Sequence, residues 1–254
     1  MVSKTSLTTA LALYALAVSA FGWGSLVSSF SAPGGGSYPN GVAYYSSYLY
    51  IGTNTPDMCY RTNTTGSVAA SHTSPTTATM GVARGAIGGT GYYWVVSYNP
   101  KLIYQVGYNS GTVYGSYAAP GVYPYGATFR SSGSTNYIYY TDKNGQMLYA
   151  LDATTGSVYS SHSLSFSPND CAYDSDGYLW ITDGTASVVR KCSLTGSVYD
   201  SFSVASYGSP SGCGYDGTYV WVGINNPLHS ILRFEVAGTA ITPSSMGKIK
   251  ATFR

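Results

Sequence analysis

The side chains in this sequence that could perform acid–base chemistry are ten acidic residues, of which all but Glu235 are aspartates. Hydrolysis of a glycosidic bond requires two carboxylates that flank the sugar linkage. Asp174, Asp176 and Asp216 lie in predicted hairpin turns, where aspartate is favoured by hydrogen bonds to its own backbone. Asp170 differs, because it lies on a strand that we expect to line a central channel. A single carboxylate in the channel argues against glycosidase activity.

Two arginines are expected near Asp170. Arg84 and Arg130 lie at or just after the strands that match the Asp170 strand in the two preceding repeats. The three residues could together bind an anion or a polar ligand at one mouth of the channel. The alternative is that they form an ion pair in the channel or are solvated residues of its rim.

The histidines do not predict a metal site. A metal ion requires several convergent ligands, and His72, His162 and His229 fall at positions that do not match one another in the repeats. The sequence also contains no recognisable Ser-His-Asp arrangement, phosphate loop or nucleotide-binding motif. We therefore predict neither a metal nor a cofactor.

The four cysteines fall into two aligned pairs. Cys171 and Cys213 occupy the same position on neighbouring strands, so a disulfide between them is conceivable in a secreted protein, although the span between their Cα atoms could exceed the limit of about 7 Å. Cys59 and Cys192 match in position but belong to repeats that do not touch. They are not expected to pair.

A repeated unit positions these residues. Residues 167–204 predict four short strands, in which Asp176-Gly177 is a hairpin turn and Gly196 belongs to the turn before the last strand. An aromatic and β-branched run identifies the second strand and occurs five times, beginning at Tyr48, Tyr93, Tyr137, Tyr178 and Tyr219. The glycine before the last strand recurs at Gly66, Gly111, Gly156 and Gly196, which are 45, 45 and 40 residues apart.

This period and strand number predict an all-β protein, a five-bladed β-propeller with four-stranded blades. The expected propeller covers residues 21–237. Residues 24–31 repeat the last strand of a blade before the first blade begins, so we expect this N-terminal strand to close the last blade. The predicted blades cover residues 38–75, 76–121, 122–166, 167–206, and 207–236 together with 24–31.

The two ends of the chain carry separate signals. Residues 1–20 combine Lys4, an apolar stretch and a small-residue end, which predicts a secretory signal peptide, with an uncleaved membrane anchor as the alternative. Residues 238–254 form a C-terminal tail or strand that could pair with a neighbouring molecule or fold back on its own propeller. Asn63-Thr64-Thr65 is a sequon in a predicted surface turn, so Asn63 is a candidate for N-glycosylation.

The composition excludes one class of partner. Only 9% of the residues are charged and the formal net charge is +2. Without a basic run or a cluster of Lys and Arg, binding to nucleic acid through phosphates is not expected. The 27 tyrosines exceed what the core requires, so some of them should stand at the surface, where they could contact sugars or proteins.

The repeat resembles a known family. The segment from Pro168 to Asp183, followed by Val189-Arg190-Lys191 and Thr195-Gly196-Ser197-Val198, is similar to NHL-type and related secreted bacterial propellers. The resemblance covers about residues 24–236 and implies the fold rather than the function, because such scaffolds carry many unrelated activities. The resemblance also extends to five-bladed propellers that are enzymes, namely glutaminyl cyclases, some glycosidases, and lyases or lactonases with a metal at the axis.

Three functions are compatible with these features. The main expectation is a secreted or cell-surface protein that is non-catalytic and acts as a structural or assembly subunit. Its C-terminal strand is the candidate for joining molecules into a filament. The first alternative is a lectin-like propeller that binds glycans through aromatic pockets. The second is an enzyme of the lyase or glutaminyl cyclotransferase kind, with its site at the channel mouth near Asp170, Arg84 and Arg130.

Overall fold

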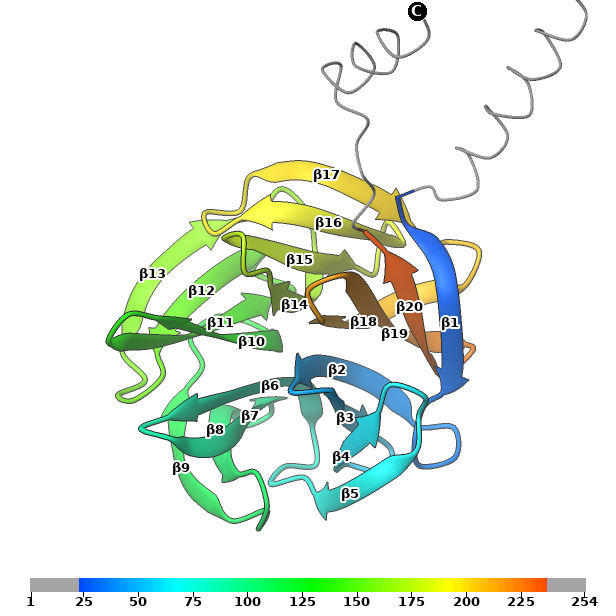
Figure 1. The fold of residues 1–254 in the computed structure, drawn as a ribbon. Helices are drawn as coiled ribbons and strands as arrows, with labels where there is room; N and C mark the ends of the chain where they lie inside the picture. The colour runs from blue at the N-terminus through cyan, green and yellow to red at the C-terminus, as the bar shows by residue number, and fades with distance from the viewer. Residues whose placement is uncertain (1–22, 237–254) are drawn as a thin grey trace, which may run out of the picture.

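A computed structural model describes residues 23–236 of the chain. These residues form twenty β-strands, arranged as five four-stranded antiparallel sheets around a common axis (Figure 1). The described part of the chain contains no helix, and so none that could span a membrane. The prediction of a five-bladed β-propeller is confirmed.

Each blade runs from an inner strand at the axis to an outer strand at the rim. Blade 1 contains β2 (Tyr38–Tyr45), β3 (Tyr48–Asn54), β4 (Met58–Asn63) and β5 (Val68–Thr73). Blade 2 contains β6 (Thr79–Ile87), β7 (Thr90–Tyr98), β8 (Lys101–Gly107) and β9 (Val113–Ala118). Blade 3 contains β10 (Pro124–Ser132), β11 (Thr135–Asp142), β12 (Met147–Asp152) and β13 (Val158–Ser163). Blade 4 contains β14 (Pro168–Tyr173), β15 (Tyr178–Asp183), β16 (Val188–Ser193) and β17 (Val198–Ser203).

Blade 5 is completed by the N-terminal strand, as the sequence predicts. Its first three strands are β18 (Gly208–Tyr215), β19 (Tyr219–Pro227) and β20 (Ser230–Glu235). The outer strand is β1 (Ser25–Ser31), which pairs antiparallel with β20 (Figure 1). The indole Nε1 of Trp23 also donates a hydrogen bond of 2.6 Å to the carbonyl of Val236. Both ends of the described chain are therefore held in one sheet, which closes the ring. The predicted signal peptide and C-terminal tail lie outside the described residues.

The core fills the spaces between blades with the aromatic side chains of the second strands. The central residue of this strand is Tyr50, Trp94, Tyr139, Trp180 or Trp221, and each of these five side chains is buried. The strand register corrects one detail of the sequence alignment. Tyr92 pairs with Gly107 as Tyr48 pairs with Asn63, so Tyr92 and not Tyr93 begins the aromatic run of blade 2.

Candidate functional site

The inner strands approach one another most closely at one repeated position. That position is occupied by Gly41, Gly81, Gly126, Asp170 and Gly212, each at or within a register shift of its inner strand. A Cβ atom on Gly81 would lie 2.5 Å from the carbonyl oxygen of Tyr125, and one on Gly126 would overlap Asp170. The axis therefore has room for one side chain, which blade 4 supplies.

The carboxylate of Asp170 ties the blades together at this point. Its Oδ2 accepts hydrogen bonds from the backbone N–H groups of Val42 (3.0 Å) and Cys213 (2.8 Å), and its Oδ1 accepts one from Cys171 (2.9 Å). Complete burial raises the pKa of Asp170 well above its usual range, and these backbone donors, with that of Ala127, oppose the shift. The structure thus places Asp170 beneath the channel mouth, where it is not accessible to a ligand.

The channel mouth is lined by the next residues of the inner strands. One position carries Tyr44, Arg84, Phe129, Tyr173 and Tyr215 in blades 1 to 5, and all five line a small cavity of about 60 Å³. Four of these residues are aromatic and one is a cation. Arg84 is therefore the residue of the mouth that departs from the repeat.

Arg84 is buried without a counter-charge. Its residue is only 8% exposed, and its guanidinium lies over the rings of Tyr45 and Tyr108, with its Cζ 4.4 and 4.5 Å from the ring centroids. Nη1 donates to the carbonyl oxygens of Gly85 and Tyr92, whereas the buried Nε has no acceptor. Within residues 23–236 the ion pairs are Arg190–Asp183 and Lys191–Asp174, so no carboxylate neutralises Arg84. A buried cation without an acidic partner keeps its positive charge available to attract an anion.

A surface groove of about 490 Å³ opens beside Arg84. We call it the arginine–tyrosine groove; the side chains that define it are Tyr45, Arg84, Thr90, Tyr108, Asn109, Ser110 and Tyr114. A Cβ on Gly91, which also lines the groove, would lie 2.6 Å from Nη2 of Arg84. Glycine at this position leaves the space that the guanidinium occupies, so the wall of the groove combines one cation with aromatic rings and uncharged hydrogen-bonding groups.

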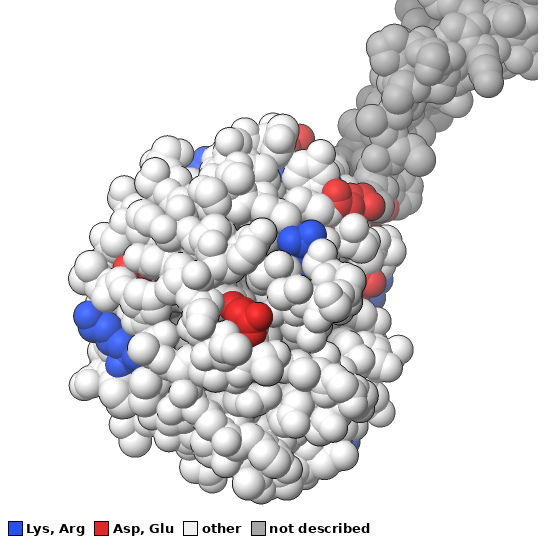
Figure 2. All heavy atoms as spheres, turned by 90° about the vertical axis from the view of Figure 1, so that its left-hand side faces the viewer, with Lys and Arg blue, Asp and Glu red and all other residues white. Residues whose placement is uncertain are grey.

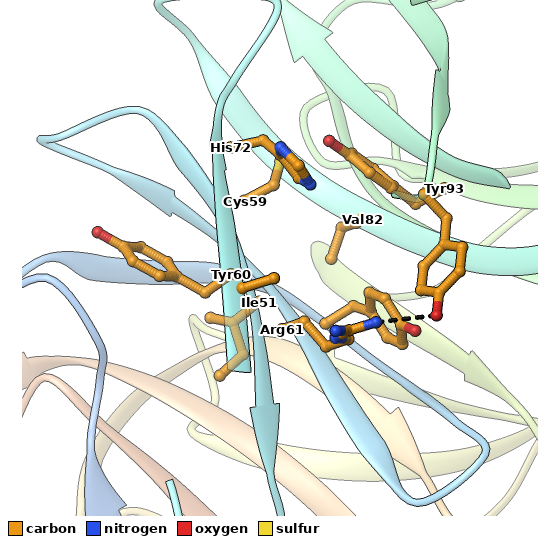
Figure 3. Close-up of a pocket in the computed structure, with 10 residues that line it drawn as sticks. Ile51, Cys59, Tyr60, Arg61, His72, Val82 and Tyr93 are labelled. Atoms are coloured by element: carbon orange, nitrogen blue, oxygen red, sulfur yellow. Dashed lines mark hydrogen bonds between the residues drawn. The ribbon is translucent and has the colours of Figure 1, made fainter. Parts of the chain in front are cut away.

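A second arginine orients Tyr108. Nη1 of Arg61 donates a hydrogen bond of 2.8 Å to the phenolic oxygen of Tyr108, marked by the dashed line in Figure 3. The interior cavity in Figure 3, which His72 and Tyr93 line, has about 10 Å³ of space. This is room for about one water molecule, so the cavity is too small for a substrate.

Arg130 lies near the same mouth but outside the groove. Its guanidinium stacks 5.4 Å from the ring of Tyr173, which lines the mouth, and 5.8 Å from the ring of Tyr137. It donates to the phenolic oxygen of Tyr139 at 3.3 Å. The structure thus brings Arg84 and Arg130 to one end of the axis, on neighbouring blades.

Two of the three aspartates that the sequence places in turns, Asp174 and Asp216, have side chains engaged in the fold. Asp174 accepts from Trp180 Nε1 and pairs with Lys191, and Asp216 accepts from Trp221 Nε1 at 2.8 Å. No acidic side chain lines the arginine–tyrosine groove. In the part of the chain from 23 to 236, no three His, Cys, Asp or Glu side chains gather as metal ligands would. The side chains of the groove that can exchange a proton near neutral pH are therefore limited to its tyrosines.

Known proteins resemble the chain in structure and not in sequence. No protein-family model and no curated protein sequence matches it. The solved structures that resemble it include a glutaminyl cyclase from Myxococcus xanthus, with a TM-score of 0.66, 10% identity, and coverage of 84% of this chain and 97% of the cyclase. The chain shares its fold with enzymes. A virginiamycin B lyase from Staphylococcus aureus has a TM-score of 0.50 and 18% identity, with coverage of 84% of this chain and 74% of the lyase. A streptogramin B lyase has a TM-score of 0.51 and 19% identity, with coverage of 83% of this chain and 70% of the lyase.

These comparisons correct the main functional expectation. The similar propellers named above are enzymes, so the prediction of a non-catalytic structural or assembly subunit is contradicted. The comparisons support the five-bladed fold, whereas membership of the NHL family and export from the cell stay predictions. Glycosylation also stays a prediction: Asn63 lies in a turn in which its Oδ1 accepts hydrogen bonds from the backbone of Thr65 and Ser67.

The structure does not contain the conceivable disulfide between Cys171 and Cys213. Both are buried free thiols. Each thiol points towards the second strand of the preceding blade: Cys171 Sγ lies 3.7 Å from the carbonyl oxygen of Tyr139, and Cys213 Sγ lies 3.3 Å from that of Trp180. Equivalent side chains on neighbouring inner strands thus point in the same rotational sense around the axis and not at each other.

We expect all four cysteines to be unreactive in the folded protein. Burial raises the pKa of Cys59 and of Cys192 to about 12, and it raises the pKa values of Cys171 and Cys213 well above their usual range. Thiolate is the reactive form. Titration with a thiol reagent at pH 8 should therefore detect almost no thiol in the native protein and all four in denaturant. Detection of only two thiols in denaturant without reductant would instead reveal a disulfide.

Proposed function

We propose that this protein is an enzyme of the lyase kind, which binds a carboxylate-bearing substrate in the arginine–tyrosine groove and eliminates a leaving group from it. The observation that carries the proposal is Arg84, a buried guanidinium without an acidic partner at the wall of a groove of about 490 Å³. The substrate carboxylate would supply the missing negative charge. Charge-assisted hydrogen bonds to a guanidinium are among the stronger contacts that a site can offer.

The neutralised carboxylate would also activate the substrate. Pairing with Arg84 withdraws charge from the carboxylate and makes the proton on the adjacent carbon easier to remove. Tyr108 is the group that we assign to take it, because its ring lines the groove and Arg61 holds its phenolic oxygen in place with a hydrogen bond.

The elimination then proceeds on the substrate carbons. The electron pair of the broken C–H bond forms a double bond to the neighbouring carbon, and the bond from that carbon to its oxygen substituent breaks. Tyr108 returns the proton to the departing oxygen, so that the tyrosine ends the cycle in the state in which it began. No water is consumed, which distinguishes this reaction from hydrolysis.

The fold is compatible with this chemistry. Two of the similar structures are named as lyases, for virginiamycin B and streptogramin B, and the third is named as a glutaminyl cyclase. We favour elimination over the cyclase reaction because the groove offers a cation and phenolic oxygens and no acidic side chain. Asp170, the carboxylate nearest the mouth in the sequence analysis, is held by backbone donors beneath it.

Replacement of Tyr108 by phenylalanine tests the mechanism. We expect turnover to fall about 100-fold or more, the usual contribution of a general acid–base group, while the affinity for a carboxylate ligand changes little. The measurement is the ultraviolet absorbance of the new double bond during incubation with galacturonate oligomers, which have a carboxylate beside the C–H bond to be broken and an oxygen substituent on the next carbon. Tyr114→Phe serves as the matched control, since its hydroxyl is not hydrogen-bonded by Arg61. Equal loss in both variants, or none in Tyr108→Phe, would refute the role of Tyr108.

A further inference from the structure

Every outer strand of the propeller carries a β-bulge at the same place. The register shifts fall where the third and fourth strands leave the turn between them, and in blade 5 between β20 and β1. A bulge redirects the side chain of its extra residue. The extra residues in blades 1 to 5 are Ala69, Tyr114, Tyr159, Tyr199 and Val27.

In three consecutive blades the bulge residue is a tyrosine that contacts a second tyrosine. The ring centroids are 5.6 Å apart for Tyr114–Tyr92, 4.9 Å for Tyr159–Tyr137 and 5.2 Å for Tyr199–Tyr178. Despite these contacts, Tyr114, Tyr159 and Tyr199 remain 62%, 67% and 64% exposed. We call these three contacts the rim tyrosine pairs. Each presents an aromatic face to solvent on a support that fixes its direction.

Blades 1 and 5 lack this feature. The equivalent second-strand tyrosines are Tyr48 and Tyr219, but the bulge residues beside them are Ala69 and Val27. In these two blades an arginine lies over the ring: Arg61 is 5.0 Å from the Tyr48 centroid and Arg233 is 3.9 Å from that of Tyr219. The scaffold therefore tolerates a small residue at the bulge, which means that tyrosine is not required there for folding.

The first rim pair is continuous with the arginine–tyrosine groove, because Tyr114 lines the groove. The second pair has a cation of its own, since Arg130 lies 5.8 Å from the centroid of Tyr137 and has no acidic partner in residues 23–236. In the third pair Lys191 lies over Tyr178 at 4.6 Å but is paired with Asp174. Uncompensated positive charge thus accompanies the pairs of blades 2 and 3.

The rim around these pairs is nearly uncharged. Figure 2 looks onto the side of the molecule that carries β13, and only isolated charged side chains appear among uncharged ones. The pairs stand one to a blade and so do not form the contiguous apolar centre of a protein interface. Separate aromatic faces at regular intervals fit a polymer whose repeating units have flat apolar faces and hydroxyl edges, which is the chemistry of a polysaccharide.

We propose that the ligand of the groove is one end of an acidic polysaccharide, a chain of uronic acids, and that the chain extends over the rim tyrosine pairs of blades 3 and 4. Tyr159 and Tyr199 stack on sugar rings, and Arg130 binds a second carboxylate. This inference rests on the proposed function, because it assigns the class of substrate that Arg84 anchors. It also predicts that affinity rises with chain length.

The test measures binding of galacturonate monomer, short oligomers and polygalacturonate to the full chain by calorimetry. In the double variant Tyr159→Ala and Tyr199→Ala, each site receives the residue that blade 1 has at its bulge. We expect this variant to bind the polymer about tenfold to 100-fold more weakly, with unchanged affinity for the monomer. Val158→Ala and Val198→Ala, at the neighbouring exposed positions, form the control and should bind like the wild type.

The outcomes separate the two proposals. Polymer affinity that is unchanged in the tyrosine double variant, or equal affinity for polygalacturonate and its fully methyl-esterified form, overturns the polysaccharide inference. Loss of monomer binding in Arg84→Gln supports the groove as the anchor, whether or not the rim contributes. Monomer binding that survives in Arg84→Gln overturns the proposed function. In that case the increase of affinity with the length of the galacturonate chain still tests the rim tyrosines by themselves. No binding of any uronate overturns the polysaccharide inference.

Discussion

Replacing Arg84 by glutamine is expected to weaken the binding of carboxylate ligands about tenfold to 100-fold, because hydrogen bonds to a charged group are worth roughly 1.5 to 3 kcal/mol. Glutamine retains hydrogen-bonding capacity but not the charge. The guanidinium of Arg84 is held between Tyr45 and Tyr108 and has no acidic partner to compete with a ligand. The measurement is a dissociation constant for galacturonate at low and high salt.

Two further variants at this position separate charge from packing. Arg84→Lys keeps a positive charge and should retain part of the affinity, although it loses the planar fork of the guanidinium. Arg84→Tyr introduces the residue that blades 1, 4 and 5 carry here, namely Tyr44, Tyr173 and Tyr215. It should fold and bind no carboxylate. Carboxylate binding by a folded Arg84→Tyr protein would show that the anion site lies elsewhere.

Removing the carboxylate of Asp170 is expected to destabilise the whole propeller by about 3 to 5 kcal/mol, since it leaves several buried N–H groups without an acceptor. The donors are the backbone groups of Val42, Cys171 and Cys213, on three different inner strands. Asp170→Gly is the informative variant, because it gives blade 4 the glycine that the other four blades carry. Urea unfolding measures the loss.

The outcome distinguishes a structural from a dispensable carboxylate. If Asp170→Gly unfolds at the same urea concentration as the wild type, the axis is held by packing alone. If it is strongly destabilised, the glycines of the other blades serve to make room for one carboxylate. Asp170→Asn retains an acceptor oxygen and should be destabilised less than Asp170→Gly.

The same residue predicts how stability depends on pH. Burial raises the pKa of Asp170 in the folded protein, whereas in the unfolded chain the pKa of an aspartate is about 4. Between these two values the folded state binds the proton more tightly, so the contribution to the free energy of unfolding decreases as the pH rises through this window. Asp170→Asn should lack this decrease. A wild-type curve of the opposite slope, absent from Asp170→Asn, would mean that the backbone donors outweigh burial.

The sequence was sufficient to predict the architecture. Five blades are predicted by the repeat and its glycine turns, and closure by β1 is predicted by the outer-strand pattern at residues 24–31. This was possible because strand and turn preferences are local and the same pattern recurs in each blade. One error of alignment, Tyr93 for Tyr92, arose in blade 2, where two tyrosines in succession fit the same pattern. Only the pairing of Tyr92 with Gly107 distinguishes them. The match of Cys59 with Cys192 was also wrong, because Cys59 pairs with Gly52 whereas Cys192 pairs with Leu179 and so is equivalent to Thr62.

The sequence also selected Asp170 and Arg84, and an alignment of the inner strands alone would have shown why. Asp170 departs from a column of glycines, and Arg84 departs from a column of aromatic residues. Their roles could not be predicted, because both depend on contacts between blades. The backbone donors that hold Asp170 come from β2 and β18 as well as β14. The rings that hold Arg84 come from β2 and from the residue that follows β8.

The remaining features were decided by the tertiary structure. Cys171 and Cys213 match in sequence, but the rotational sense of the blades points their thiols at Tyr139 and Trp180 and not at each other. The rim tyrosines Tyr114, Tyr159 and Tyr199 are visible in the sequence only as part of the Val-Tyr repeat of the outer strands. Their exposure follows from a bulge that adds one residue to each outer strand, and a bulge is set by how two strands pair rather than by the composition of either one.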